Sequence, residues 1–194
     1  MQSSTLYRAE STPHTGTTWS IDPIHSAIGF AVKHMMFATV HGRFGNFQGA
    51  IRFDGGRPAA VEAQIDAATI DTGIKKRDDH LRSADFLDAL VYPTISFHST
   101  RIEPVSALDR YHWTVVGDLT LSGVSRSVEL AVEQAGGRDR PDADVLEFRA
   151  ATKINRKDFG MEFNLPIEGG GLVVGDEVKV TIRVQAHRLP SIPA

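Results

Sequence analysis

Hydrophobic and polar residues alternate with a period of two through most of the chain after residue 16. The clearest run is at residues 178–186, where Val178, Val180, Ile182, Val184 and Ala186 alternate with polar residues. Alternation of this kind places one face of a β-strand in a core and the other in water. Similar runs occur at residues 28–32, 47–53, 61–67, 113–121, 128–132 and 146–152.

Glycine-containing turns separate these runs, because glycine tolerates the positive φ that tight turns require. They are Asp54-Gly55-Gly56, Ser122-Gly123, Ala135-Gly136-Gly137 and Gly169-Gly170-Gly171. Residues 75–90 depart from the strand pattern, since they are rich in charged residues and alanine and space their apolar residues as a helix does. We therefore expect an all-β antiparallel meander with one or two short helices near residues 75–90.

A sandwich and a closed barrel both fit such a meander, and two features favour the barrel. The runs at residues 40–53 and 110–121 are long, and internal glycines permit the strong coiling that closure requires. These glycines are Gly42, Gly45, Gly49 and Gly117. The interior of an eight-stranded barrel holds either packed side chains or one slender ligand. The pattern predicts a single eight-stranded antiparallel barrel and leaves the content of its pore open.

Composition and charge exclude several functional classes. The 194 residues fit one domain, and the absence of cysteine rules out disulfides, thiolate nucleophiles and cysteine-based zinc sites. The formal charge is -3 without basic clustering, so no nucleic acid partner is expected. No apolar stretch is long enough for a membrane span. We expect a disordered leader (1–16), a barrel domain (17–189) and a short tail (190–194), and, since the leader is polar, a cytoplasmic protein.

The histidines raise the alternative of an enzyme, because histidines and carboxylates can build metal or acid-base sites. His25, His34 and His41 do not have the spacing of a helical zinc motif. No hydrolase elbow, phosphate loop or dinucleotide fingerprint occurs in the chain. We predict no catalytic residue, metal or cofactor, and a site assembled from different strands stays open as an alternative.

Several short motifs resemble the YceI-like family, and they follow one another in the family's order between residues 19 and 187. They are the segments at residues 19–26 (WSIDPIHS), 30–34 (FAVKH), 77–82 (RDDHLR), 85–88 (DFLD), 93–97 (PTISF), 117–124 (GDLTLSGV), 156–160 (RKDFG) and 174–178 (VGDEV). The resemblance implies a lipocalin-like barrel that binds a polyisoprenoid, such as an isoprenoid quinone or a prenyl pyrophosphate, in its pore. It also implies a homodimer.

Candidate pore-lining residues are large apolar side chains on the inward faces of the expected strands and insertion. They are Phe30, Val32, Phe44, Phe86, Phe97, Trp113 and Phe148. Burial of a prenyl tail contributes about 25 cal/mol for each Å² of apolar surface removed from water, so such a lining binds without specific polar contacts. An ordinary filled core is the alternative for each of these residues.

Candidate head-group residues are Arg77, His80 and His25. Arg77 and His80 lie where the strand pattern gives way to the insertion, and both can donate hydrogen bonds to a quinone carbonyl or a pyrophosphate. Asp78 and Asp79 fit a solvated helix face with a capping carboxylate. His25 lies in a turn in which Asp22 can accept hydrogen bonds from nearby backbone N–H groups.

Arg156 and Asp158 fit an internal ion pair better than a ligand contact. The sequence as a whole favours a protein that binds and carries or stores an amphiphilic polyisoprenoid. Two alternatives stay open. One is an enzyme that acts on a prenyl or other apolar substrate, and the other is a structural or stress-induced barrel whose pore is full.

Overall fold

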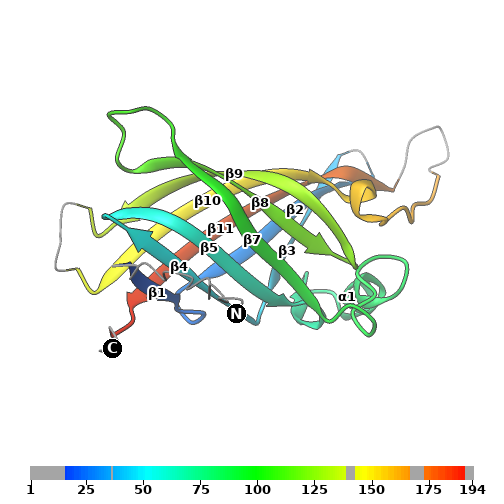
Figure 1. Cartoon of the computed structure of the whole chain (residues 1–194). Helices are drawn as coiled ribbons and strands as arrows, with labels where there is room; N and C mark the ends of the chain where they lie inside the picture. The colour runs from blue at the N-terminus through cyan, green and yellow to red at the C-terminus, as the bar shows by residue number, and fades with distance from the viewer. Residues whose placement is uncertain (1–15, 36, 139–142, 167–172, 191–194) are drawn as a thin grey trace, which may run out of the picture.

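Antiparallel strands make up most of the described chain, which comprises residues 16–35, 37–138, 143–166 and 173–190 of a computed structural model (Figure 1). The strands are β1 (Thr17–Ile21), β2 (Ala27–His34), β3 (Ala38–Phe44), β4 (Phe47–Asp54), β5 (Arg57–Asp66), β6 (Ile70–Asp71), β7 (Thr94–Pro104), β8 (His112–Leu121), β9 (Val124–Gly136), β10 (Val145–Asn155) and β11 (Val174–Arg188). The helices are α1 (Lys75–Arg82) and two 3-10 turns, η1 (Ala67–Thr69) and η2 (Arg156–Phe159).

The sheet closes on itself through β11. Strands β1, β4, β5, β7, β8, β9, β10 and β11 are hydrogen-bonded in that order, and β11 pairs with β1 to complete the ring. The free edge of β11 serves two strands, since residues 186–188 pair with β1 and residues 174–183 pair with β2. β2 and β3 therefore extend the barrel beyond β1 and β4. The predicted eight-stranded antiparallel barrel is confirmed.

The predicted helical insertion is confirmed, and its helix is shorter than residues 75–90. α1 ends at Arg82, and residues 83–92 continue as turns at the same end of the barrel (Figure 1). The Ser122 hydroxyl, in the β8–β9 turn, donates to the backbone oxygens of Phe86 and Leu87 at 3.1 and 3.2 Å. The insertion is thereby tied to the ends of β8 and β9.

The barrel end that carries α1 has two unlike sides. β3 pairs with β6 only at Arg43 and Phe44, and β2 and β3 continue past that point to their own hairpin. β10, β11, β2 and β3 form one side of this end, and α1 with residues 83–92 lies on the other (Figure 1). No helix in the described residues is long and apolar enough to cross a membrane.

The long run expected at residues 40–53 is interrupted, which the alternation alone did not predict. β3 ends at Phe44 and β4 begins at Phe47. The Thr69 hydroxyl accepts the backbone N–H groups of Gly45 and Asn46 at 3.2 and 3.1 Å. A side chain from η1 thus satisfies the donors that the broken ladder leaves free.

Two of the predicted tight turns occur where glycine allows them, whereas Ala135 and Gly136 of a third belong to β9. Gly55 and Gly56 join β4 to β5 with positive φ, and Ser122 and Gly123 do the same between β8 and β9. The triple glycine at 169–171, residues 1–15 of the expected leader and residues 191–194 of the expected tail lie outside the described residues.

Asp22 organises the break between β1 and β2. Its Oδ1 accepts the backbone N–H groups of Ile24 and His25 at 2.8 and 3.4 Å. Its Oδ2 accepts from His25 Nδ1 at 2.7 Å and from His187 Nε2 at 3.2 Å, because an ionised carboxylate can only accept. These hydrogen bonds lower the pKa of Asp22 from 3.8 to about 2, and the bond from the His25 ring makes the largest contribution.

This network predicts a pH-dependent stability. Ionised Asp22 stabilises the fold fully above pH 3.8, and the stabilisation is lost as the pH falls from 3.8 through about 2. Asp22→Asn should therefore lower the free energy of unfolding near neutral pH, and the deficit should shrink towards pH 2, as measured by urea unfolding across this range. Asp118→Asn, which removes an exposed carboxylate of β8, controls for the loss of one charge. A deficit that does not change with pH would contradict this account.

Candidate functional site

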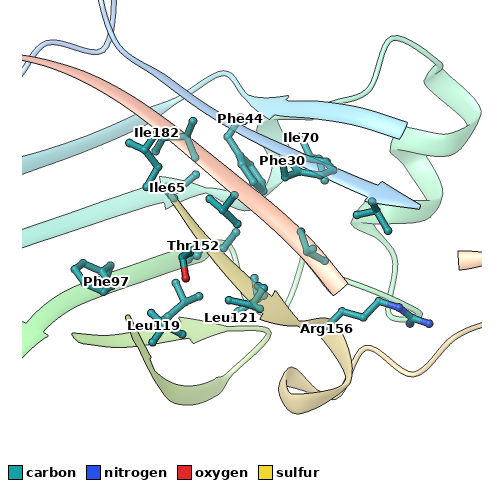
Figure 2. Close-up of a pocket in the computed structure, with 18 of the residues that line it drawn as sticks. Phe30, Phe44, Ile65, Ile70, Phe97, Leu119, Leu121, Thr152, Arg156 and Ile182 are labelled. Carbon is teal, nitrogen blue, oxygen red and sulfur yellow. The ribbon is translucent and has the colours of Figure 1, made fainter. Parts of the chain in front are cut away.

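A cavity of about 470 Å³ occupies the interior of the barrel, within the range of about 300–1,000 Å³ typical of ligand pockets. Its wall is built from the inward faces of the strands together with α1 and the segment after η2. Figure 2 shows Phe30 of β2, Phe44 of β3 and Ile182 of β11 directed into one space. The pore is therefore not a packed core, because ordinary cores contain few voids larger than a water molecule.

Short side chains create this space. The inward positions of β11 that line the cavity are Val178, Val180, Ile182 and Val184, and β10 contributes Ala150. None of these side chains reaches far across a barrel of eight strands. The bulkier Phe97 is accommodated by Gly117 on the neighbouring strand, where an added Cβ would lie 2.4 Å from the phenylalanine ring.

Aromatic residues close the end of the barrel opposite α1. Trp113 and Phe148 line the cavity and are buried, with ring centroids 6.5 Å apart. Phe53 packs on Phe148 at 6.5 Å and on Trp19 at 6.2 Å, beyond the cavity. The Arg188 guanidinium lies 5.0 Å from the centre of the Trp19 ring. This end is a packed aromatic layer.

The cavity reaches the surface at the α1 end. Among the described lining residues, only Lys33, His80 and Leu165 are exposed, and all three lie at that end. The polar side chains of the described lining are Lys33, His34, Arg77, His80, Thr152 and Arg156. No aspartate or glutamate belongs to the described lining. The cavity therefore combines an apolar interior with cationic and imidazole groups at its opening.

The structure brings together most of the residues that the sequence singled out. Seven predicted pore residues all line the cavity, namely Phe30, Val32, Phe44, Phe86, Phe97, Trp113 and Phe148. Arg77 and His80 lie at its opening. His25 does not belong to the lining, because its ring is turned to Asp22 in the exposed connection between β1 and β2. The part of all these residues in ligand binding stays a prediction.

Arg77 and His80 are held in place by local hydrogen bonds. Arg77 Nε donates to the Thr72 hydroxyl at 2.7 Å, and its Nη2 donates to the Thr72 carbonyl at 2.9 Å. His80 Nε2 lies 2.8 Å from Asp85, and its ring meets those of Phe86 and Phe163 edge-on at 5.1 and 4.7 Å. Nη1 of Arg77 and Nδ1 of His80 form no hydrogen bond with another described residue, so a ligand can engage them.

Asp78 corrects an expectation. The helix pattern assigned it to a solvated face, yet it is buried and accepts hydrogen bonds from the backbone N–H and the hydroxyl of Thr72. These two hydrogen bonds fix Thr72 in the chain just before α1. Asp79 is exposed as expected, and it pairs with Lys75 at 2.7 Å and with Arg82 at 3.1 Å.

His34 was missed as a lining residue, although the sequence contains the signal. It continues the inward series of Ile28, Phe30 and Val32 by one more step of two residues. Its ring forms no hydrogen bond with another described residue. Lys33 could not be found in this way, since its position in the alternation is outward and it reaches the opening only at the end of β2.

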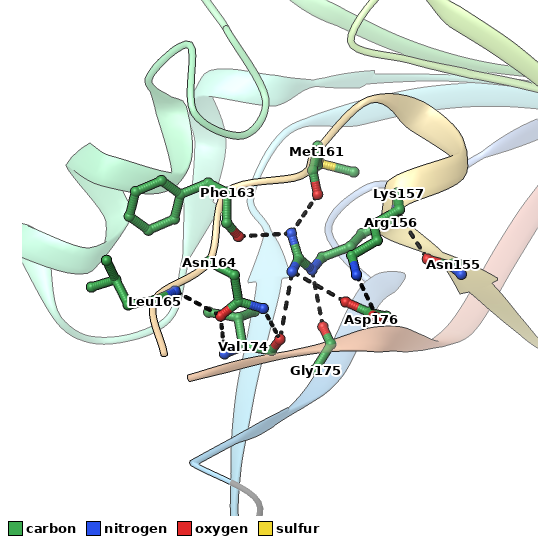
Figure 3. Close-up of polar contacts among 10 residues, drawn as sticks. All are labelled: Asn155, Arg156, Lys157, Met161, Phe163, Asn164, Leu165, Val174, Gly175 and Asp176. Atoms are coloured by element: carbon green, nitrogen blue, oxygen red, sulfur yellow. Dashed lines mark hydrogen bonds and ion pairs between the residues drawn. The ribbon is translucent and has the colours of Figure 1, made fainter. Parts of the chain in front are cut away.

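Arg156 holds the opening together (Figure 3). Its guanidinium donates to the carbonyl oxygens of Gly175 at 3.0 Å and Phe163 at 2.9 Å, and also to that of Met161. The ion pair expected with Asp158 is wrong, because the partner is Asp176 at 3.2 Å. Asp158 lies in η2 itself, whereas Asp176 lies on β11, where the buried guanidinium points. Burial lowers the pKa of Arg156, and Asp176 opposes that shift.

We expect Arg156→Met to lower the free energy of unfolding by about 3 kcal/mol or more, because it leaves several buried carbonyl oxygens without donors. Chemical denaturation measures the change. Arg149→Met, the same substitution at an exposed position of β10, should cost far less. Equal losses in the two variants would show that the hydrogen bonds of Arg156 contribute little.

Within the described residues, no group of three histidine, aspartate or glutamate side chains is arranged to hold a metal ion.

Comparison with known proteins places the chain in a family. Residues 19–186 match the model of the YceI-like domain. Protein YceI of Escherichia coli O157:H7 is 36% identical over 144 residues, which cover 73% of each chain. The crystal structure of Burkholderia cenocepacia BcnA has a TM-score of 0.71 and 25% identity, and the match covers 85% of this chain and 98% of that one.

A polyisoprenoid binding domain from Saccharophagus degradans, implicated in plant cell wall breakdown, has a TM-score of 0.65. The match covers 88% of this chain and 98% of that domain, and at 17% identity it shows a shared fold alone. The family model and the E. coli relative carry the assignment, and the solved structures agree with the observed barrel. The chain belongs to the YceI-like family.

Proposed function

We propose that this protein binds an amphiphilic polyisoprenoid and carries or stores it, with the prenyl tail in the barrel cavity and the head group at the opening. The observation that carries the proposal is the apolar cavity of about 470 Å³, closed by aromatic residues at one end and open at the other. Such a shape accepts a long apolar chain from one end only. The ligand therefore enters tail first.

The wall of the cavity suits a hydrocarbon tail. Thr152 is the one polar side chain of the described lining that does not lie at the opening. Each Å² of apolar ligand surface buried there contributes about 25 cal/mol, without any specific polar contact. Polyisoprenoid binding by the similar domain from S. degradans supports this class of tail.

The opening suits a polar or anionic head group. Lys33, His34, Arg77 and His80 all face it, and the described lining contains no carboxylate that would repel a pyrophosphate. The same donors can bind the carbonyl oxygens of an isoprenoid quinone. These two head groups are the candidates, and parallel binding assays with both distinguish them.

The two alternatives predict different behaviour. A structural barrel with a filled pore is difficult to reconcile with a cavity of this size. An enzyme would convert a prenyl substrate that the carrier returns unchanged. A homodimer and a cytoplasmic location stay predictions from the sequence.

Ala150→Phe tests the cavity as the binding site. The new ring would project from β10 into the cavity and occupy the volume that the tail needs, without introducing charge. We expect at least about a tenfold loss of affinity for a prenyl quinone, because several buried CH₂ groups are displaced. Mass spectrometry of an organic extract of the detergent-free protein, together with titration of added quinone, measures occupancy and affinity.

Ala151→Phe is the matched control, since Ala151 lies on the same strand with its side chain exposed on the outer face. It should bind as the wild type does. Wild-type protein that yields no prenyl compound and binds no added quinone or prenyl pyrophosphate would refute the carrier function. Recovery of a chemically altered ligand would favour an enzyme instead.

His34→Leu and His80→Leu test the head-group role. Removal of donors at the opening should weaken binding of a prenyl pyrophosphate by about tenfold and leave a plain isoprenoid hydrocarbon nearly unaffected. His41→Leu changes an exposed histidine of β3 that does not belong to the described lining, and it should affect neither ligand. Fluorescence titration with both ligands measures the difference. Equal losses for the two ligands would remove the head-group role.

A further inference from the structure

Exposed apolar side chains gather around the open end of the barrel. They come from four separate segments, and they are Met35 and Phe37, Ile74, Leu90 and Val91, and Leu165. Phe37 is 88% exposed and Leu90 is 97% exposed, so each projects almost its whole side chain into solvent. Isolated apolar residues on a surface need no explanation, but a set around one opening does. We call this set the apolar rim.

The segments of the apolar rim lie at the barrel end that carries the opening. Ile74 directly precedes α1, which contributes Arg77 and His80 to the cavity wall. The Met35 N–H donates to the carbonyl of Val173 at 2.8 Å, and the Val173 N–H donates to that of Leu165 at 3.0 Å. The β2–β3 connection, α1 and the chain after η2 lie at one end of the barrel (Figure 1).

The charged side chains that line the opening itself are cationic, which favours docking on a surface that carries negative charge. Lys33 and Lys76 are exposed and form no ion pair with another described residue. Asp79 and Asp85 are paired with cations or imidazole groups of the same end, whereas Asp158 and Glu162 near η2 are exposed and form no ion pair with another described residue. Arg77, which lines the opening, adds a further positive charge. Anionic lipid head groups attract lysine side chains near a bilayer surface.

We propose that the open end docks on the surface of a lipid bilayer that contains anionic lipids, with the apolar rim inserted among the head groups. The proposal rests on the proposed function, because a polyisoprenoid is poorly soluble in water and resides in a bilayer. Docking places the opening against the bilayer from which the ligand comes. The ligand then moves between bilayer and cavity without exposing its tail to water.

The form of the apolar rim fits a bilayer better than a folded partner. Its side chains come from connections between elements and not from one face of a helix or strand, so they do not form the extended face on which a partner's helix or strand packs. A fluid interface adapts to separate projections, and apolar residues flanked by lysines are typical of interfacial membrane contact. Leu108, which is 94% exposed, lies in the β7–β8 connection at the opposite end of the barrel (Figure 1).

Flotation of the purified full chain with vesicles of phosphatidylethanolamine and phosphatidylglycerol tests the proposal. The double variant Phe37→Ser, Leu90→Ser should partition onto the vesicles at least about tenfold less than the wild type, because two exposed anchors are removed. Leu108→Ser, an equally exposed apolar residue at the other end, should partition as the wild type does. Thermal unfolding checks that the variants are folded, and Phe37→Ser alone replaces the double variant if that one is not.

A wild-type protein that does not float with the vesicles overturns the proposal, as does a rim variant that floats equally well. Self-association that the rim substitutions abolish, without vesicle binding, would assign the apolar rim to a second copy of the chain and also overturn it. Prenyl quinone binding is measured separately in vesicle-free solution. Loss of that binding alone refutes the proposed function, whereas loss of flotation alone refutes membrane docking.

Discussion

Closure of the sheet by β11 is the constraint on which the rest of the structure depends. Once β11 pairs with β10 on one edge and with β1 and β2 on the other, every inward side chain faces the same enclosed axis. The size of those side chains then decides whether the axis is filled. Valine, isoleucine and alanine on β10 and β11 are too short to meet across it. The cavity follows from closure combined with these short residues.

The two ends of the barrel differ because the long side chains are unevenly distributed. Trp19, Phe53, Trp113 and Phe148 gather at one end and pack against one another, so that end needs no cover. At the other end the wall is completed by α1 and by the segment that Arg156 holds to β11. The polar side chains at the opening come from α1, η2 and the end of β2, whereas the strands within the barrel carry almost none. Under the proposed function, the head group of an amphiphile binds at the open end and its tail binds among the strands.

Much of this could be predicted from the sequence, because a period of two gives the direction of each side chain. The series that includes Phe30 and Val32 extends by the same period to His34, which also lines the cavity. The alternation cannot give distances across the barrel, so it could not decide between a filled pore and a cavity. It also could not pair Arg156 with Asp176, which closure brings together from different elements.

The proposed uptake of a ligand at the open end needs no movement of α1. The cavity already reaches the surface beside Lys33, His80 and Leu165, and hydrogen bonds hold α1 beside it. The Arg82 guanidinium at the end of α1 donates to the carbonyl oxygens of Ala68 in η1 and Ile70 in β6, at 2.6 and 2.7 Å. A fixed opening still exposes a newly arriving tail to water unless its source lies against the rim. Under the proposed docking, the exposed apolar residues hold the bilayer against the opening, a role that would offset the aggregation hazard that such residues carry.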